Sequence, residues 1–336
     1  MKAVRVHGPG DVRLDEVEAP VAGERDVVVR VAAAGICGSD VTYVRTGGVA
    51  APATEPFGLG HELAGTVETV GAAVQGIRPG DRVIVNPMGD GNAIGAGVPE
   101  GAFAPRLLVR DATLGGAIHR IPDDLSFDRA ALAEPLSVSL HAVNRSEAKP
   151  GDRVVLFGAG PIGLGILIFL KQRGITDIAV VDTTDHRLDR ARRLGATLTV
   201  NPDRQDLREA LGVAFGMGEL FGWPVVNATH WFEVTGSAAV VDSIVALAPF
   251  HARMVLVAVH HDPVPVNFQM ALGKEMTIVT SMAYPDEFPD VIAAIEGGVD
   301  LSPMISHVLP FADFEAAFAT AQDRHVSAKV LVTFDD

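Results

Sequence analysis

The first third of the chain alternates hydrophobic and polar residues in short runs. Such runs occupy Asp26–Val31 and Gly65–Val70, and glycine and proline residues separate them from their neighbours. A two-residue period is typical of a strand with one buried face, and Gly and Pro clusters mark turns between strands. The pattern predicts a β-rich region from residue 1 to about residue 109.

Beyond residue 126 the hydrophobic period lengthens to that of a helix. Asp128–His141 has apolar residues at helical spacing, and from residue 152 apolar strands alternate with helical runs. The predicted strands are 152–157, 177–181, 231–234, 254–259 and 276–279, and the predicted helices are 164–173, 186–194 and 238–247. Continuous apolar strands between helices indicate a parallel sheet covered on both faces.

These patterns predict an α/β protein with two domains. A β-rich domain occupies 1–136, a doubly wound parallel-sheet domain occupies 137–279, and the chain returns to the first domain over 280–336, ending on a strand at 328–334. The length of 336 residues and the hydrophobic content of 48% suit two domains with substantial cores.

Charge narrows the range of partners. The chain has 27 Lys and Arg against 42 Asp and Glu, a net charge of −15. Such a surface repels phosphate backbones and anionic membranes. We therefore expect small-molecule partners, and neither nucleic acid nor membrane.

The sequence also favours a cytoplasmic location. Met1–Val6 alternates like a strand and lacks the apolar core of a secretory signal. The longest apolar stretch, Pro161–Leu170, is too short to span a bilayer. A single cysteine excludes an intrachain disulfide, which fits a reducing compartment.

That cysteine, Cys37, lies between glycine residues, and His61 and Glu62 follow it 24 and 25 positions later. Taken alone, a single cysteine is more often a small buried hydrophobic residue. However, the neighbouring glycines permit sharp turns that direct the sulfur and the imidazole into a cleft. A structural zinc needs four protein ligands, whereas a catalytic zinc takes three and keeps one position open. The pattern predicts one catalytic metal site, for which Glu134 is a further acidic ligand and Asp40 is placed to orient the imidazole.

A second motif, with glycines at 158, 160 and 163, lies between a predicted strand and a predicted helix. Asp182 follows the last glycine by 19 residues, at the end of the next strand. This context is typical of a dinucleotide site: Gly158 makes the turn, Gly160 admits the pyrophosphate, and Gly163 allows close packing of helix and strand. Amides at the start of the helix, beside Pro161 and at Ile162, then hold the phosphates.

Asp182 favours NAD over NADP. Its carboxylate can accept hydrogen bonds from the adenosine ribose diol, and it repels a 2′-phosphate. Arg187 either stacks on adenine or pairs with a phosphate, and both roles stay open. A packed βαβ unit without a ligand is the alternative interpretation of the motif.

Six motifs in one order carry a resemblance that covers nearly the whole chain. They are Gly35–Asp40, Gly60–Glu62, Pro79–Val83, Glu134–Ser137, Gly158–Gly163 and Thr235–Ser237. With them the chain resembles the zinc-dependent medium-chain dehydrogenases, in the branch of sorbitol, L-idonate, butanediol and threonine dehydrogenases. The resemblance implies a GroES-like catalytic domain, a Rossmann domain, and a homodimer or homotetramer.

The resemblance also implies roles for individual residues. Cys37 and His61 match zinc ligands, Glu134 matches a carboxylate that binds zinc directly or through its water, and Glu62 matches an acid that can exchange into the ligand set. Ser39 matches a hydroxyl that contacts the substrate oxygen, and Asp40 matches the partner of the histidine. Tyr43 is expected to line the substrate pocket.

Three positions depart from the family pattern. The segment Val85–Gly101 has no cysteine, so we expect one catalytic zinc per chain and no structural zinc. Thr42 stands where some relatives have a relay histidine, which leaves the proton path open. Ala283 stands near an arginine of the polyol enzymes, which weakens the case for a heavily hydroxylated sugar alcohol.

The sequence thus predicts a zinc-dependent, NAD-dependent oxidoreductase that acts on a secondary alcohol or vicinal diol. Two alternatives stay open: a zinc-free NAD(P)H reductase of quinones or enones with the same fold, and a nucleotide-binding protein without turnover. The pair His260-His261 is not expected to share a metal, because adjacent residues at a strand end point to opposite sides. The apolar strand 276–279 could pair across a two-fold axis.

Overall fold

The computed structural model describes residues 1–335 and divides them into two compact units. The first unit comprises 1–134, 288–301 and 305–335, and the second comprises 135–287 and 302–304. The sequence placed the return to the first domain at residue 280, whereas residues 280–287 pack with the second unit.

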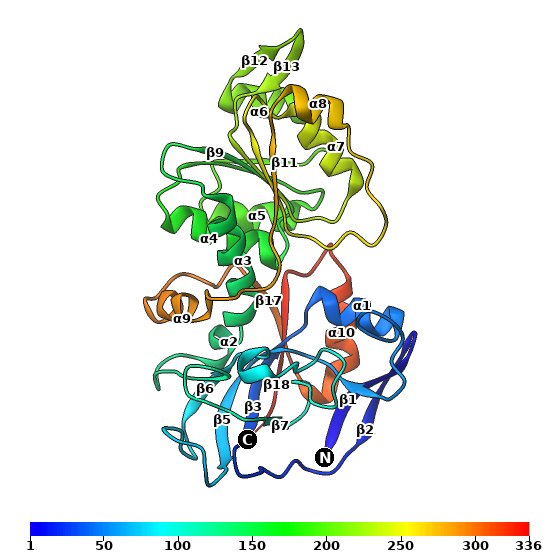
Figure 1. Ribbon diagram of the computed structural model, residues 1–336, viewed down its shortest axis with the longest axis vertical. Coiled ribbons are helices and arrows are strands. Elements are labelled where there is room, and N and C mark those ends of the chain that lie inside the picture. The colour runs from blue at the N-terminus through cyan, green and yellow to red at the C-terminus, as the bar shows by residue number, and fades with distance from the viewer. Residues whose placement is uncertain (336) are drawn as a thin grey trace. The chain divides into compact units, whose positions relative to one another are not determined.

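The first unit is built mainly of antiparallel strands (Figure 1). Its strands are β1 (Lys2–Gly8), β2 (Asp11–Glu16), β3 (Val27–Gly35), β4 (Phe57–Gly58), β5 (Glu62–Val70), β6 (Arg82–Val85), β7 (Arg106–Val109), β8 (Ile118–Arg120), β17 (Ile305–Pro310) and β18 (Lys329–Thr333). Its helices are α1 (Gly38–Thr46), α2 (Phe127–Ala130), α9 (Phe288–Glu296) and α10 (Phe314–Gln322), with short 3-10 turns η1 (Gly89–Gly91) and η2 (Phe311–Asp313).

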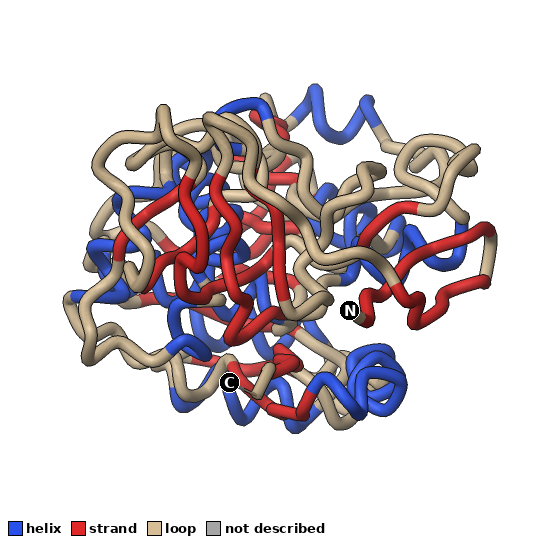
Figure 2. The backbone as a smooth tube through the Cα atoms, turned by 90° about the horizontal axis from the view of Figure 1, so that it is seen from below, coloured by secondary structure: helices blue, strands red, loops and turns tan. Residues whose placement is uncertain are grey.

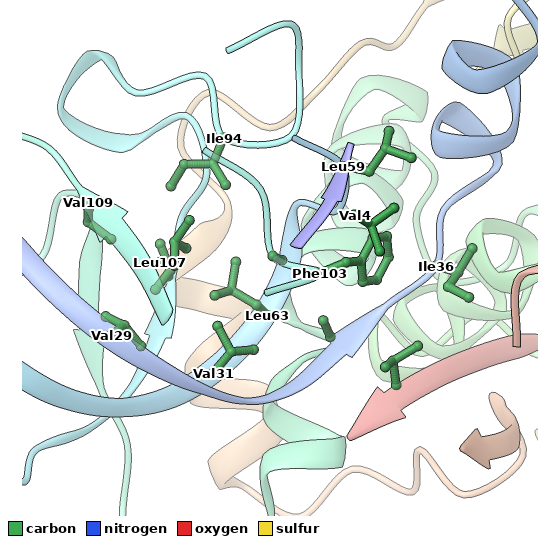
Figure 3. Close-up of a cluster of buried hydrophobic side chains, with 14 of the residues drawn as sticks. Val4, Val29, Val31, Ile36, Leu59, Leu63, Ile94, Phe103, Leu107 and Val109 are labelled. Atoms are coloured by element: carbon green, nitrogen blue, oxygen red, sulfur yellow. The ribbon is translucent and has the colours of Figure 1, made fainter. Parts of the chain in front are cut away.

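Two sheets organise this unit. The larger has the order β17-β18-β3-β5-β6-β8, with β7 also paired to β3, and the smaller has the order β2-β1-β4. Inward-facing residues of these strands form one hydrophobic core, part of which is drawn in Figure 3 with Val29, Val31, Leu63 and Phe103 among its labelled side chains. On β5 the predicted alternation of buried and more exposed residues holds over 65–68, whereas on β3 Val27, Val28 and Val29 are all buried, so this part of β3 is covered on both faces.

The second unit contains the parallel sheet. Its strands are β9 (Arg153–Phe157), β10 (Asp177–Val181), β11 (Leu198–Val200), β12 (Met217–Leu220), β13 (Trp223–Val226), β14 (His230–Glu233), β15 (Arg253–Leu256) and β16 (Thr277–Thr280). Its helices are α3 (Ala133–Ser146), α4 (Pro161–Gln172), α5 (Asp185–Arg193), α6 (Leu207–Phe215), α7 (Ala238–Leu247) and α8 (Phe268–Gly273). Helix α3 begins in the last two residues of the first unit's opening segment.

Six parallel strands form the central sheet in the order β11-β10-β9-β14-β15-β16. This is the 3-2-1-4-5-6 order of a doubly wound dinucleotide-binding sheet, whose ligand crevice lies at the carboxyl ends of the strands where the order reverses. Here the reversal falls between β9 and β14. The predicted fold class, a β-rich domain with a Rossmann-type domain, is confirmed.

The structure corrects the predicted helix over 128–141. It consists of α2 and α3, separated by Ala131 and Leu132. Pro135 explains the break, because its ring has no N–H and clashes with the carbonyl four residues earlier, so proline is tolerated only in the first turn of a helix. The helix accordingly restarts at Ala133.

The structure also contains a hairpin that the sequence analysis did not predict. Strands β12 and β13 pair antiparallel and project from one end of the second unit (Figure 1). Loops and turns, tan in Figure 2, connect most elements, and the Gly-rich segment 86–101 is such a loop apart from η1. Within residues 1–335 no helix is both long enough and apolar enough to cross a membrane.

Candidate active site

The pairing of β3 with β5 brings the cysteine and the histidine together. Gly35, at the end of β3, pairs with Glu62, at the start of β5, so Cys37 and His61 follow and precede the same end of this strand pair. Ligand atoms of Cys37, His61 and Glu62 lie within 4.8 Å of one another. In the described part of the chain this is the one group of three such side chains close enough to hold a metal ion.

The donor set fits zinc. A thiolate, an imidazole and a carboxylate are ligands that zinc takes in proteins, and tetrahedral zinc holds its ligand atoms about 3.6 Å apart. A separation of at most 4.8 Å between the three ligand atoms is compatible with one shared ion.

Asp40 organises this cluster from a fully buried position. One carboxylate oxygen accepts the backbone N–H of Cys37 at 2.8 Å, and the other accepts the N–H of Gly60 at 3.1 Å and lies 3.6 Å from Nδ1 of His61. The Sγ atom of Cys37 in turn accepts the N–H of Asp40, which completes a capping box at the start of α1. Burial raises the pKa of Asp40. Asp40 thus holds both predicted ligands, as a carboxylate behind a metal-binding histidine does.

The electrostatics of His61 favour a cation at this place. Burial disfavours its charged form, but negative neighbours, led by Asp40, hold the pKa of His61 well above its ordinary value. Ser39 lies beside the ring, with Oγ 3.4 Å from Nε2 of His61. The negative neighbours that raise the pKa of His61 would also favour a bound cation. Ser39 places a hydroxyl beside the ring.

Glu62 has a partner that sequence reasoning missed. Both of its carboxylate oxygens lie 2.6 Å from Nζ of Lys329, which also donates to the carbonyl oxygen of Ile36 at 3.1 Å. Glu62 is fully buried and Lys329 is 2% exposed. Burial lowers the pKa of Lys329, but the negative charge of Glu62 raises it by more, so the pKa of Lys329 is raised overall. The available signal was a lysine inside the apolar strand 328–334.

The room for Glu62 depends on Gly35. A Cβ atom at Gly35 would lie 2.0 Å from Oε2 of Glu62, so a larger residue there would displace the Glu62 carboxylate. Gly35 therefore leaves the space that the Glu62 carboxylate occupies.

Glu134 and Tyr43 lie close to the cluster without belonging to its three-residue set. Glu134 is the second residue of α3 and is 8% exposed, and its charge acts on His61, Tyr43 and Lys329. Tyr43, on α1, is half-buried, and burial raises its pKa. The structure thus gathers every predicted metal and substrate residue in the first unit: Cys37, Ser39, Asp40, Tyr43, His61, Glu62 and Glu134.

The loop that lacks cysteines is held by side-chain hydrogen bonds. The Asp90 carboxylate accepts hydrogen bonds from the backbone N–H and the side-chain hydroxyl of Thr113, both at 2.8 Å, and from the N–H of Ala117 at 2.7 Å. Asn92 bonds to both the N–H and the carbonyl oxygen of Arg110. These contacts anchor the loop to the segment that follows β7.

The glycine turn of the second unit has the shape that a pyrophosphate needs. Gly158 has φ +103°, which residues with a Cβ rarely adopt. A Cβ at Gly163 would lie 1.9 Å from the carbonyl oxygen of Gly158, so α4 packs directly on the turn. At Gly160 the nearest atom to an added Cβ is Nη1 of Arg187, 3.7 Å away, which leaves its backbone open to a ligand. Pro161 and Ile162 begin α4, where proline suits the first position.

Asp182 lies beside this turn. One carboxylate oxygen accepts the N–H of Ala159 at 2.8 Å and the other accepts that of Thr184 at 2.8 Å. The carboxylate is therefore fixed just after β10, where it contacts the glycine turn at Ala159. The predicted dinucleotide residues Gly158, Gly160, Pro161, Ile162, Gly163, Asp182 and Arg187 all lie in the second unit.

Two family models match the chain. The alcohol dehydrogenase GroES-like domain matches residues 23–122, and the zinc-binding dehydrogenase model matches residues 161–297. Sorbitol dehydrogenase of Homo sapiens is 30% identical over 98% of this chain and 95% of its own. (R,R)-butanediol dehydrogenase of Bacillus subtilis is 32% identical over 89% of each chain.

Solved structures agree with the sequence comparisons. A short chain alcohol dehydrogenase from E. coli CFT073, complexed with NADH, has a TM-score of 0.86 and 27% identity over 99% of each chain. A putative zinc-binding dehydrogenase from Sinorhizobium meliloti 1021, bound to NADP, has a TM-score of 0.87 and 26% identity over 99% of this chain and 98% of its own. The chain belongs to the zinc-type alcohol dehydrogenases of the medium-chain dehydrogenase family.

Proposed function

We propose that this alcohol dehydrogenase is zinc-dependent and NAD-dependent and interconverts a secondary alcohol or vicinal diol with the corresponding ketone. The observation that carries the proposal is the convergence of Cys37, His61 and Glu62 within 4.8 Å, beside the Ser39 hydroxyl. A quinone or enone reductase without metal has no use for these three ligands together.

Cys37 and His61 would hold one zinc ion, with either Glu62 or Glu134 as the acidic ligand. Glu62 lies within the cluster but is paired with Lys329, whereas Glu134 acts on His61 through its charge from the start of α3. When bound, zinc supplies a Lewis acid that lowers the pKa of an alcohol, and NAD supplies the hydride acceptor. Asp40 would keep the ligands in place, and Ser39 would accept the hydroxyl proton of the substrate as it releases its own proton to solvent water.

NAD is the proposed cofactor because of the fixed Asp182 carboxylate. An acceptor beside the glycine turn suits the two ribose hydroxyls, and its charge opposes a 2′-phosphate. The guanidinium of Arg187 lies over Gly160, which favours pairing with the pyrophosphate over stacking on adenine. The relatives named above include one with NADH and one with NADP, so cofactor choice depends on these residues of this chain.

The names of the relatives support a diol or polyol as substrate. Ala283, in place of an arginine, favours a small diol over a heavily hydroxylated sugar alcohol. We also propose a homo-oligomer, because β16 is an edge strand of the parallel sheet and its Ile278 is partly exposed. A cytoplasmic location remains part of the proposal from the sequence alone.

The test measures zinc per chain in protein purified without added metal or chelator, together with the affinity for NADH and NADPH. We expect about one zinc and tighter binding of NADH. Replacing Cys37 by serine should abolish zinc binding and turnover with butane-2,3-diol while NADH affinity stays within about twofold, because the two sites lie in separate units. His251→Gln, at an exposed histidine paired with Glu275, is the matched control and should keep the zinc.

Absence of zinc even after incubation with the metal would refute the zinc mechanism and favour the zinc-free reductase. One zinc and tight NADH binding without turnover of any alcohol or ketone would favour a binding protein. Tighter binding of NADPH would refute the assignment of Asp182.

A further inference from the structure

The second half of the cofactor crevice contains a pair of side chains that the function above does not use. The glycine turn after β9 and Asp182 after β10 serve the adenosine half of a dinucleotide. In a doubly wound sheet, the other mononucleotide half belongs to the strands beyond the reversal, here β14, β15 and β16. The loops that follow β14 and β15 are therefore the surface that meets the nicotinamide half.

Glu233 ends β14 and organises the first of these loops. It is fully buried, and its Oε1 accepts the backbone N–H of Thr235 at 2.8 Å, the Thr235 hydroxyl, and the N–H of Gly236 at 3.0 Å. A carboxylate that accepts several short bonds from one turn fixes the path of that turn. The turn also touches the adenosine side, because a Cβ at Gly158 would lie 3.0 Å from the carbonyl oxygen of Val234.

His260 joins the second loop to the same carboxylate. Its Nε2 lies 3.0 Å from Oε2 of Glu233, and its side chain is 16% exposed. The backbone carbonyl of Glu233 accepts the N–H groups of Val257 and Ala258, at 3.0 and 3.3 Å. A Cβ at Gly236 would lie 3.0 Å from the carbonyl oxygen of Val259, so the two loops pack closely. His261, the neighbour of His260, is exposed, as expected for adjacent residues that point to opposite sides.

A buried carboxylate needs a hydrogen-bond donor for each oxygen, since an unsatisfied buried acceptor is costly. The loop after β14 satisfies Oε1, and His260 satisfies Oε2 from a loop that lies one strand away. Because an ionised carboxylate only accepts, Nε2 carries the proton in this pair. Loss of the imidazole would leave Oε2 without this donor and the two loops without their side-chain link.

We propose that the Glu233–His260 pair is a positioning device that holds the loops after β14 and β15 in the shape that receives the nicotinamide ring of the dinucleotide. This inference rests on the proposed NAD dependence. His260 acts through Glu233 and the loop backbone, so it is a positioning residue and not a catalytic one.

The experiment compares two ligands by isothermal titration calorimetry on the full chain: NADH, and ADP-ribose, which lacks the nicotinamide ring. His260→Ala should weaken NADH binding about tenfold, the loss expected for one hydrogen bond to a charged group, while ADP-ribose affinity stays within about twofold. His260→Gln should restore NADH affinity to within about threefold of the wild type, because its amide can donate to Glu233. His261→Ala is the matched control and should change neither affinity.

If His260→Ala does not fold, His260→Asn takes its place, since its shorter amide does not reach Glu233. Equal weakening of NADH and ADP-ribose, or an unchanged NADH affinity, would overturn the inference while the proposed function stands. Failure of the glutamine variant to recover NADH binding would overturn the role through Glu233. A wild-type chain that binds neither ligand would refute the proposed function itself.

Discussion

Replacing Lys329 by methionine should destabilise the first unit strongly. Lys329 faces both oxygens of Glu62 at 2.6 Å, and the two side chains are 2% and 0% exposed. Methionine keeps the length and the apolar stem of lysine but removes its charge. The variant therefore leaves the carboxylate of Glu62 in the protein interior without its cation.

Removing one partner of a buried ion pair costs about 3–5 kcal/mol, because the remaining charge loses both its hydration and its partner. For a unit of this size, each kcal/mol lowers the melting temperature by about 2–4 °C, so we expect a decrease of about 6–20 °C. The double variant Lys329→Met with Glu62→Gln should recover part of this loss, because the neutral amide leaves no unpaired charge in the protein interior.

Differential scanning calorimetry in the presence of a chelator measures this effect without a contribution from metal. Arg106→Met is the matched control: Arg106 pairs with Glu68 at 2.9 Å, but the two side chains are 40% and 34% exposed. Exposed pairs contribute about 0–1 kcal/mol, so the control should melt within a few degrees of the wild type. Equal melting temperatures for the Lys329 and Arg106 variants would refute the reasoning.

Two further predictions concern the second unit. Gly163→Ala should weaken NADH binding at least tenfold and lower the melting temperature, because its Cβ would lie 1.9 Å from the carbonyl oxygen of Gly158. Gly273→Ala, with open space around it, is the control and should change neither quantity. A Gly163 variant with the NADH affinity and melting temperature of the wild type would contradict this prediction. Buried Lys274 donates to the carbonyl oxygens of Val245 and Ala246, and burial lowers its pKa from 10.5 to about 8. Between these values the unfolded chain binds the extra proton, so the free energy of unfolding should rise with pH relative to Lys274→Met from about pH 8 to pH 10.5; denaturation curves at pH 7.5 and pH 9.5 that show the opposite sign would exclude this shift.

The sequence by itself determined the class of the fold. The change of hydrophobic period near residue 126 separates the β-rich unit from the parallel-sheet unit, because a strand with one buried face and a strand buried on both faces have different patterns. The glycine turn at 158–163 could also be predicted from the sequence, because its strand, its glycines, its helix and Asp182 lie within 30 residues of one another. Pro135 is the sequence signal for the break in the predicted helix.

The cluster of Cys37, His61 and Glu62 could be predicted in part from the sequence. Cys37 and His61 stand at turns rich in glycine, and their spacing fits two neighbouring strands. The contact of Asp40 with Cys37 is also local in sequence, because the helix that starts after Cys37 turns the Asp40 carboxylate back toward the Cys37 N–H. The same carboxylate reaches the N–H of Gly60.

Only the tertiary structure decided which distant residues complete each site. Lys329 meets Glu62 across 267 positions, and His260 meets Glu233 across 27. Hydrophobic periodicity tells which face of a strand is buried, but not which strands are neighbours or in what register they pair. A buried charge finds its partner through that strand order, so Lys329 and Glu233 looked like isolated polar residues in apolar strands until the sheets were assembled.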